Sequence, residues 1–333
     1  MMLSTEILNE LKDKKNLLAF SAGVDSTALF FILIECQINF DIAIVDYGLR
    51  EQSKEEVLYA KELASSHDIV CHLFNASQIS TNFEATARAI RYDFFHSLIT
   101  EFHYDNLLTA HHLGDRFEWM LMQFCKGAGC PELSSMKSID KNENYSLLRP
   151  LLNVDKQDLQ TFLDNKHIKY FIDESNSNQE IKRNYFRHAH SDILLKKYKE
   201  GIKKSFSYID NDAKELIKDT KIIKIKDFAY FNSHNKRSDI YLIDKYLKSC
   251  NLMITASERE LLKIQDTLIV GRKYVVNWHL DFVFIAPYDA KSQSMSHEFK
   301  EKMRVFRIEP KLRSYFFANE EVFESLASSE PLQ

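Results

Sequence analysis

The sequence predicts an α/β fold: a doubly wound parallel sheet of the Rossmann-like type, followed by a smaller domain of mixed α+β structure. Two observations lead to this prediction. Apolar runs that read as buried strands alternate with helical stretches, and these runs occupy residues 16–20, 41–46, 69–74 and 106–110. The alternation ends near Phe206, so we expect one domain over residues 1–205 and a second over residues 206–333.

Composition limits the class of protein. The chain has 333 residues, 45% of them hydrophobic, which is enough for a large core and two domains. The apolar runs are too short to cross a bilayer and the start does not resemble a signal peptide, so we expect a cytoplasmic protein with no membrane partner. Five cysteines without a C-x-x-C pair argue against a disulfide framework or a zinc knuckle.

The first strand leads into a turn of small residues at 21–26 (SAGVDS), after which a helix begins. A glycine lets the backbone approach a ligand closely, and a helix N-terminus offers free N–H groups, so this turn suits a phosphate. Asp25 could hold Mg²⁺ or orient the turn. The alternative is an ordinary capped strand-to-helix turn. No Walker motif, G-x-x-x-x-G-K-[ST], occurs in the sequence.

Residues 82–102 have the period of one long helix with an apolar stripe. Glu84, Arg88 and Arg91 fall on another face of it, because they are spaced at i, i+4 and i+7. This pattern is also typical of a solvated charged face.

A further cluster of polar residues follows the strand at 106–110, where His111 and His112 precede another helix. Asp115 and Glu118 lie near its first turn. They could simply complement the helix dipole, or they could bind Mg²⁺ or accept protons from an amine. Zinc is not indicated, because no second pair of His or Cys residues accompanies the two histidines.

The stretch from Ile181 to Lys204 contains eight Lys or Arg residues and two acidic residues, with aromatic residues and histidines between them. Charge runs are usually solvated helix faces, but a basic run in an acidic protein favours contact with nucleic acid. A polar cluster at 173–178 precedes this stretch. Further upstream, Asp155 is expected to cap a helix that extends through Leu163.

The second domain contains two recognisable local patterns. Residues 257–260 (SERE) read as a capping box before a short helix. Residues 273–278 and 281–286 read as the two strands of a hairpin. Neither pattern indicates a catalytic function.

Taken in order, the motifs resemble the bacterial tRNA(Ile)-lysidine synthetases, which are N-type ATP pyrophosphatases of the PP-loop superfamily. The motifs are residues 21–26, 45–50, 87–92, 111–118, 126–129, 149–152 and 173–187. The resemblance is close over the N-terminal half and loose over the rest. The departures from the family's pattern are Ala22 for glycine, Gly114 for an acid, Arg116 for glutamine, Trp119 for threonine and Lys126 for arginine.

The resemblance implies a PP-loop catalytic domain over residues 1–205, ending in a basic helical linker, and a tRNA-binding domain over residues 206–333. In this family ATP adenylates the C2 oxygen of the wobble cytidine of the isoleucine tRNA with a CAU anticodon. Free lysine then displaces AMP to give lysidine, and pyrophosphate is the other product. ATP and Mg²⁺ are the implied cofactors, and a homodimer is left open.

The resemblance also assigns roles by matched position. The catalytic residues would be Asp25, Arg91, Asp115, Glu118 and Arg187. The ATP-binding residues would be Ser21, Ala22, Gly23, Val24, Asp25, Ser26, Val45, Gly127 and Gly129. The tRNA-binding residues would be Arg183, Lys196, Lys197 and Lys199, and Mg²⁺ would be held by Asp25 and Asp115.

Two alternatives stay open at this point. A tRNA thiolation enzyme uses the same adenylation, but it normally needs a cysteine pair, and Cys125 and Cys130 are the only near pair. A catalytically inactive module that binds ATP or tRNA is suggested by Ala22 and Gly114. The presence of Asp25, Ser26, Asp115 and Glu118 argues against it.

Overall fold

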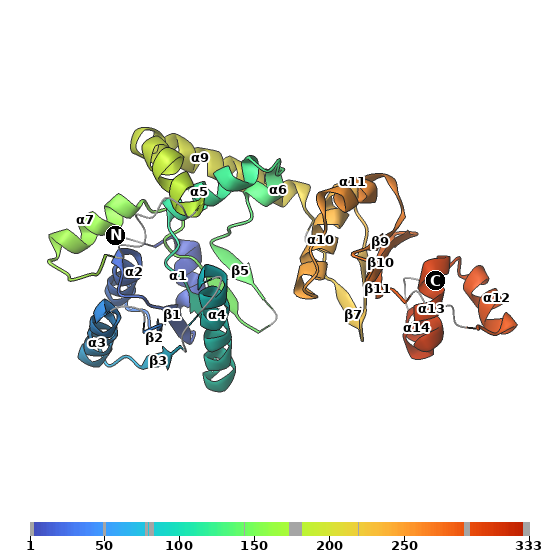
Figure 1. Cartoon of the computed structure of the whole chain (residues 1–333), viewed down its shortest axis with the longest axis horizontal. Coiled ribbons are helices and arrows are strands. Elements are labelled where there is room, and N and C mark those ends of the chain that lie inside the picture. Colours follow the sequence, from blue (N-terminus) through green and yellow to red (C-terminus); the bar gives the residue numbers. More distant parts are fainter. Residues whose placement is uncertain are drawn as a thin grey trace. The chain divides into compact units, whose positions relative to one another are not determined.

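The computed structural model of the protein describes residues 3–48, 51–76, 79, 83–142, 144–172, 182–218, 220–289 and 294–328. The chain divides into two compact units, Met1–Ile209 and Asp210–Gln333 (Figure 1). Two predicted features, residues 49–50 of the second motif and the polar cluster at 173–178, lie outside the described residues. Among the described helices, none combines the length and the apolar character that crossing a membrane requires.

The first unit is built on a six-stranded sheet with the strand order β3-β2-β1-β4-β6-β5. Its strands are β1 Asn16–Ala19, β2 Phe40–Asp46, β3 Cys71–Asn75, β4 Asn106–Leu108, β5 Ile139–Lys141 and β6 Ser146–Leu148. All neighbouring strands are parallel except β5 and β6. The predicted parallel sheet is therefore confirmed. The antiparallel edge was not predicted, because strands of three residues are too short to show a period.

Helices cover both faces of this sheet. One face packs against α1 Thr5–Leu11, α2 Val24–Glu35, α3 Glu51–Ser66 and α7 Lys156–Asn165, and the other against α4 Phe83–Phe102. The other helices of this unit are α5 Leu113–Phe124, α6 Cys130–Leu133, α8 Lys182–Phe186 and α9 Asp192–Leu216. Successive side chains of β1 point to opposite faces. Leu18 packs in a cluster with α1, α2, α3 and α7, whereas Leu17 packs in a cluster with α4.

The strand order reverses at β1, with β2 and β3 on one side and β4 on the other. Because α2 and α4 lie on opposite faces here, a crevice forms at the carboxyl ends of β1 and β4, which is where such sheets bind ligands. The turn at 21–26 follows β1, and the histidine pair follows β4. The fold thus brings together two motifs that are far apart in the sequence.

A π-helical turn, Arg187–Ser191, connects α8 to α9. The predicted domain boundary at residue 206 falls inside α9. There, Phe206 is 1% exposed, and the Arg116 guanidinium lies 4.1 Å from its ring centroid. Phe206 belongs to the core shared with Leu113 and Phe117 of α5, so α9 is part of the first unit up to this point.

The second unit contains a five-stranded antiparallel sheet with the order β7-β8-β11-β10-β9. Its strands are β7 Ile223–Ile225, β8 Phe228–Asn232, β9 Thr267–Val270, β10 Tyr274–His279 and β11 Phe282–Pro287. Its helices are α10 Lys236–Ser249, α11 Ala256–Ile264, α12 His297–Val305, α13 Pro310–Ala318 and α14 Glu320–Ala327. One face of the sheet packs with α10 and α11, and the other with α12, α13 and α14.

The hairpin predicted at 273–286 is formed by β10 and β11. The capping box predicted at 257–260 is wrong by two residues. Thr255 is the N-cap of α11, its side chain accepts a hydrogen bond from the backbone N–H of Glu258, and Glu258 accepts one from the backbone N–H of Thr255 in return.

Candidate active site

The loop after β1 is ordered by its own hydrogen bonds. The Ser21 backbone N–H donates to Ser26 Oγ (3.2 Å), and the two serine hydroxyl oxygens lie 3.1 Å apart. The Ser26 hydroxyl donates to the carbonyl of Gly23 (3.3 Å), which is the N-cap of α2. Because glycine has no side chain to cap the helix, the first N–H groups of α2 are available to a phosphate.

Ala22 has a φ of +57°, in the left-handed region that favours glycine. Its methyl group is fully buried in the core under the loop, and its carbonyl accepts a hydrogen bond from the backbone N–H of Phe171 (2.9 Å). Packing and this hydrogen bond offset a conformational cost of about 1–2 kcal/mol. The chain thus forms this turn with a Cβ at residue 22.

Asp25 lies in the first turn of α2. Its Oδ1 is buried and accepts no hydrogen bond from any residue in the described part of the chain. Its Oδ2 lies 3.8 Å from His112 Nε2 and 4.0 Å from Lys156 Nζ. An acidic oxygen that is buried without a donor is costly, so Asp25 is well suited to accept a ligand.

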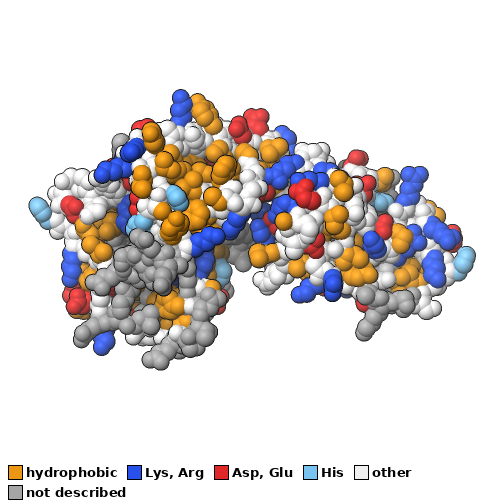
Figure 2. All heavy atoms as spheres, turned by 45° about the horizontal axis from the view of Figure 1, so that its top comes forward, with side chains coloured by type: hydrophobic (Ala, Val, Ile, Leu, Met, Phe, Trp, Pro, Cys, Tyr) orange, Lys and Arg blue, Asp and Glu red, His pale blue; other side chains and the backbone are white. Residues whose placement is uncertain are grey.

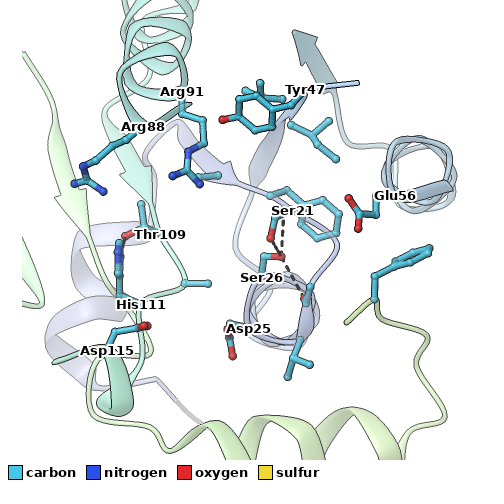
Figure 3. Close-up of a pocket in the computed structure, with 18 of the residues that line it drawn as sticks. Ser21, Asp25, Ser26, Tyr47, Glu56, Arg88, Arg91, Thr109, His111 and Asp115 are labelled. Carbon is cyan, nitrogen blue, oxygen red and sulfur yellow. Dashed lines mark hydrogen bonds between the residues drawn. The ribbon is translucent and has the colours of Figure 1, made fainter. Parts of the chain in front are cut away.

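A cavity of about 580 Å³ opens at the carboxyl ends of β1, β2 and β4. In Figure 3, Ser21 and Asp25 face Arg91, His111 and Asp115 across it. The predicted site residues that line this cavity are Ser21, Gly23, Val24, Asp25, Ser26, Val45, Arg91, Asp115 and Arg183. Those that do not line it are Ala22, Glu118, Gly127, Gly129, Arg187, Lys196, Lys197 and Lys199.

His112 is the N-cap of α5 and joins the two halves of the crevice. Its Nδ1 accepts a hydrogen bond from the Gly114 N–H (3.0 Å), so the ring proton is on Nε2 when the imidazole is neutral. Nε2 faces Asp25 Oδ2 at 3.8 Å and Asp115 Oδ2 at 3.5 Å. The backbone N–H of His112 also donates to Asp115 Oδ2 (3.0 Å), which completes a capping box.

Asp115 and Glu118 are held by two arginines. Arg183 Nη2 and Arg187 Nη2 donate to Asp115 Oδ1, at 2.9 and 3.0 Å. The Nε groups of Arg183 and Arg187 donate to Oε1 and Oε2 of Glu118, at 2.5 and 2.9 Å. The two acids lie three residues apart on α5 and the two arginines four residues apart, so each pair shares one helical face. This four-residue cluster fixes α8 and the π-helical turn to α5.

Burial and neighbouring charges have opposite effects on the pKa values of the two acids in this cluster. Burial would raise the pKa of Asp115, but the nearby His112 and the guanidiniums of Arg183 and Arg187 outweigh it and hold that pKa well below its usual range. Burial raises the pKa of Glu118 against the opposing effect of Arg183 and Arg187. Burial also lowers the pKa of His111 to about 4, so His111 is neutral at neutral pH.

The donor set fits Mg²⁺ better at Asp25 than at Asp115. Both oxygens of Asp115 already accept hydrogen bonds, whereas Asp25 Oδ1 accepts none from the described residues. The described residues contain no group of three or more His, Cys, Asp or Glu side chains that could hold a metal ion. Mg²⁺ sites that use one or two carboxylates together with substrate phosphates are common, and Asp25 suits that kind of site.

Sequence reasoning missed Lys156, which lines the cavity and lies near Asp25. It directly follows Asp155, which is the N-cap of α7 as predicted, and it comes soon after the end of β6. Applying the rule that ligands bind at carboxyl strand ends to every strand would have drawn attention to it. Arg88 also lines the cavity; it lies in the motif at 87–92 but was not among the predicted site residues.

The remaining predicted residues lie elsewhere. Gly127 has a φ of +79° in the turn after α5, and Gly129 is the N-cap of α6. Lys196 and Lys197 are exposed on α9. Lys199 donates to both oxygens of Asp158 (3.1 Å each), so it is already engaged in an ion pair with α7.

Comparison with known proteins agrees with the resemblance that the sequence motifs indicate. Residues 3–193 match the PP-loop domain family. The chain is 39% identical to a tRNA(Ile)-lysidine synthase of Helicobacter pylori (strain ATCC 700392 / 26695), over 93% of this chain and 92% of the relative. It is 38% identical to a tRNA(Ile)-lysidine synthase of Campylobacter jejuni (strain RM1221), over 98% of this chain and 100% of the relative.

Among solved structures, the U34-tRNA thiolase NcsA from Methanococcus maripaludis matches with a TM-score of 0.51. The match covers 63% of this chain and 75% of that chain at 18% sequence identity, so the likeness concerns the fold alone. The two synthases, in contrast, are similar to this chain over nearly its whole length. The chain therefore belongs to the tRNA(Ile)-lysidine synthase family of PP-loop proteins.

Proposed function

We propose that the protein uses ATP to attach free lysine to C2 of the wobble cytidine in the isoleucine tRNA with a CAU anticodon. The observation that carries the proposal is the cavity at the β1–β4 switch point, where the turn at 21–26 faces Asp115. Relatives of nearly the same length that bear the name of this activity support it. The same comparison favours this function over thiolation.

The first step is adenylation of the cytidine C2 oxygen. A cytidine C2 carbonyl is a poor electrophile until its oxygen becomes a phosphate ester. Ser21, Ser26 and the N–H groups of α2 would bind the phosphates, with Arg91 on the facing wall. Asp25 would hold Mg²⁺, which offsets negative charge on the phosphates when it is bound.

The second step is attack by the lysine ε-amine with loss of AMP. An amine with a pKa of about 10.4 costs roughly 4.6 kcal/mol to hold in its neutral form at pH 7. Asp115 lines the cavity and stays ionised, so it can attract and orient the ammonium group. Its lowered pKa makes it a weak base, so the amine would lose its proton to solvent before the attack. The ammonium must then compete with Arg183 and Arg187 for Asp115 Oδ1. Glu118 keeps both arginines in place, because its two carboxylate oxygens accept hydrogen bonds from their Nε groups.

The tRNA would be bound by Arg183 and by the basic side of α9, with the second unit binding the body of the tRNA. Lys196 and Lys197 are exposed and supply positive charge for this contact. Lys199 contributes less, because its charge is paired with Asp158. Figure 2 shows hydrophobic side chains gathered on the face of the first unit that carries α5 and α9, with lysine and arginine side chains around them.

The decisive assay combines the purified protein with ATP, Mg²⁺, labelled lysine and the isoleucine tRNA. We expect lysine to enter the tRNA in step with formation of AMP and pyrophosphate. Formation of ADP and phosphate instead would exclude this reaction. Asp25→Asn should fold normally and lose turnover, because it removes the charged oxygen at the loop. If the wild-type protein binds ATP and tRNA but never transfers lysine, it is an inactive binding module.

A further inference from the structure

Two arginines of α4 form part of the cavity wall that faces the turn at 21–26. Arg88 and Arg91 lie three residues apart on α4, and both line the cavity in Figure 3. Both side chains belong to exposed residues, so they lie at the cavity's mouth and not at its floor. In the part of the chain that the structure describes, neither guanidinium forms an ion pair with a carboxylate.

Tyr92 holds the Arg88 guanidinium in a defined orientation. The Arg88 Cζ lies 4.6 Å from the centroid of the Tyr92 ring, and Nη2 donates to the Tyr92 hydroxyl (3.3 Å). A guanidinium that is held over a ring and uses one N–H for a hydrogen bond keeps its remaining N–H groups available for a planar or tetrahedral oxyanion. This arrangement suits anion binding better than a freely rotating side chain does.

The surroundings of Arg88 add positive potential. Burial lowers the pKa of the Arg149 guanidinium, whose Nη1 donates to the Lys137 carbonyl; Asp140 opposes this effect and Arg88 adds to it. Burial lowers the pKa of His111, on the same wall of the cavity, and the charges of Arg149, Arg183 and Arg88 act in the same direction while Asp115 opposes them. An oxyanion that binds to Arg88 would also be attracted by the Arg91 guanidinium, because both arginines line the same cavity.

The identity of the anion that binds to Arg88 follows from the positions that the ATP phosphates and the nucleotide base would occupy. The ATP phosphates belong at the N-terminus of α2, across the cavity from Arg88. A nucleotide whose base enters a pocket leaves its backbone phosphates at the mouth. We propose that Arg88, positioned by Tyr92, binds the phosphodiester next to the cytidine that enters the cavity. This inference rests on the proposed function, because it takes the substrate to be that tRNA.

The test uses the full chain and an RNA hairpin that carries the CAU anticodon. Arg88→Gln should raise the KM for this RNA roughly tenfold, while kcat and the KM values for ATP and lysine stay near those of wild type. The slope of log affinity against log salt should fall by about 0.7, as expected for one lost phosphate contact to a single strand. Lys12→Gln, at the amino ends of the strands, is the matched control and should change neither quantity.

The phosphate itself can be tested with a methylphosphonate, which is uncharged, on either side of the wobble cytidine. At the contacted position it should weaken binding to wild type but cause no further loss with Arg88→Gln, since both changes remove the same contact. Tyr92→Ala should also weaken RNA binding, but by less than Arg88→Gln does. Tyr92→Phe keeps the ring and should retain most of the wild-type affinity for the RNA.

Other outcomes would overturn the assignment. If both methylphosphonates weaken wild type and Arg88→Gln equally, Arg88 does not contact these phosphates. If Arg88→Gln instead raises the KM for lysine and loses the preference for lysine over 1,5-diaminopentane, the anion is the lysine carboxylate. A raised KM for ATP alone would place Arg88 with the ATP phosphates. If wild type binds the hairpin with the expected salt slope but transfers no lysine, the proposed function fails while the phosphate contact stands.

Discussion

Gly114 illustrates how a single missing Cβ shapes the site. A Cβ built at this residue would lie 2.7 Å from His112 Cε1 and 3.0 Å from His112 Nδ1. The His112 ring cannot easily move aside, because it is 3% exposed and faces the carboxylates of Asp25 and Asp115. The acid that the family usually has here would therefore displace the histidine from its place between the two carboxylates.

We expect Gly114→Ala to lower the free energy of unfolding by about 1–3 kcal/mol, as overpacked positions usually do. Turnover should also fall, since the His112 link between the loop and Asp115 is disturbed. Gly201→Ala is a suitable control, because Gly201 lies in α9 with open space around it. That change should be neutral or stabilising in the same urea titration. Equal stability of the two variants would show that His112 relaxes without cost.

His111 makes stability depend on pH. Its pKa in the folded protein is about 4, below the ordinary value of 6.5, because burial disfavours the charged ring. The unfolded chain therefore takes up this proton first as the pH falls, so stability is lost between about pH 6.5 and pH 4. At about 1.4 kcal/mol for each pH unit, the loss attributable to His111 is about 3 kcal/mol.

The measurement is the difference in unfolding free energy between pH 7.5 and pH 4 for wild type and for His111→Gln. Glutamine cannot take up a proton but can still form a hydrogen bond with Thr109, whose hydroxyl lies 2.9 Å from His111 Nδ1. The variant should lose less stability than wild type across this window. The same pH dependence in both proteins would mean that His111 titrates normally in the folded state.

At the scale of secondary structure, the cluster between α5 and α8 determines how the site is assembled. Glu118 is 1% exposed and binds both arginines, so Glu118→Gln leaves two guanidiniums with one charged acceptor. We expect a loss of about 3 kcal/mol in the free energy of unfolding. Glu62→Gln, on the exposed surface of α3, should have almost no effect.

The two chemical steps separate a positioning role for Glu118 from a role as proton acceptor. If Glu118 acts by holding Arg183 and Arg187, lysine transfer in Glu118→Gln should be slow and a higher pH should not restore it. If Glu118 takes the proton of the lysine amine, a higher pH should partly restore transfer, because more free amine is present. Lysine incorporation near the wild-type rate at neutral pH would contradict both roles.

The lysines of α9 differ in their surroundings, although the sequence places them side by side. Lys199 is paired with Asp158 and Asp155, whereas Lys196 and Lys197 are exposed. The double variant Lys196→Gln and Lys197→Gln should therefore flatten the salt dependence of tRNA binding, because fewer counterions are released. Lys199→Gln should change the slope much less. A slope that falls equally in both variants would show that tRNA displaces the two aspartates.

For the molecule as a whole, local patterns predicted the sheet but not the contacts between elements. The apolar runs and the rule for carboxyl strand ends placed the turn at 21–26 and Asp115 at one cavity. The pairing of Arg187 with Glu118 joins residues 69 apart in the sequence, and no local period reports on it. The position of the capping box was predicted wrongly for another reason. Thr255 and Ser257 both precede a glutamate by three residues, so the motif alone cannot choose between them.

The division into two units gives a prediction about truncation. A protein that ends after residue 216 keeps α9 complete and should bind ATP normally, while its KM for tRNA rises roughly tenfold or more as phosphate contacts are lost. A protein that ends after residue 205 also loses Phe206, which is fully buried beside Arg116. It should be less stable than the longer form by about 3–5 kcal/mol. A KM for ATP that rises as much as that for tRNA would contradict this division of roles.

The π-helical turn at Arg187–Ser191 has a consequence for how the gene can vary in length. Such a turn contains one residue more than an α-helical turn, and each helical residue advances the side-chain direction by about 100°. The wide turn therefore accommodates one residue that a regular α-helix could not hold without rotating everything after it. Loss of the single codon for Ala189 would convert this turn to an α-helical turn and leave Leu195 in the core it shares with α5. Loss of one residue just after the turn, such as Ile193, would instead rotate Leu195 out of that core and turn the exposed lysines with it.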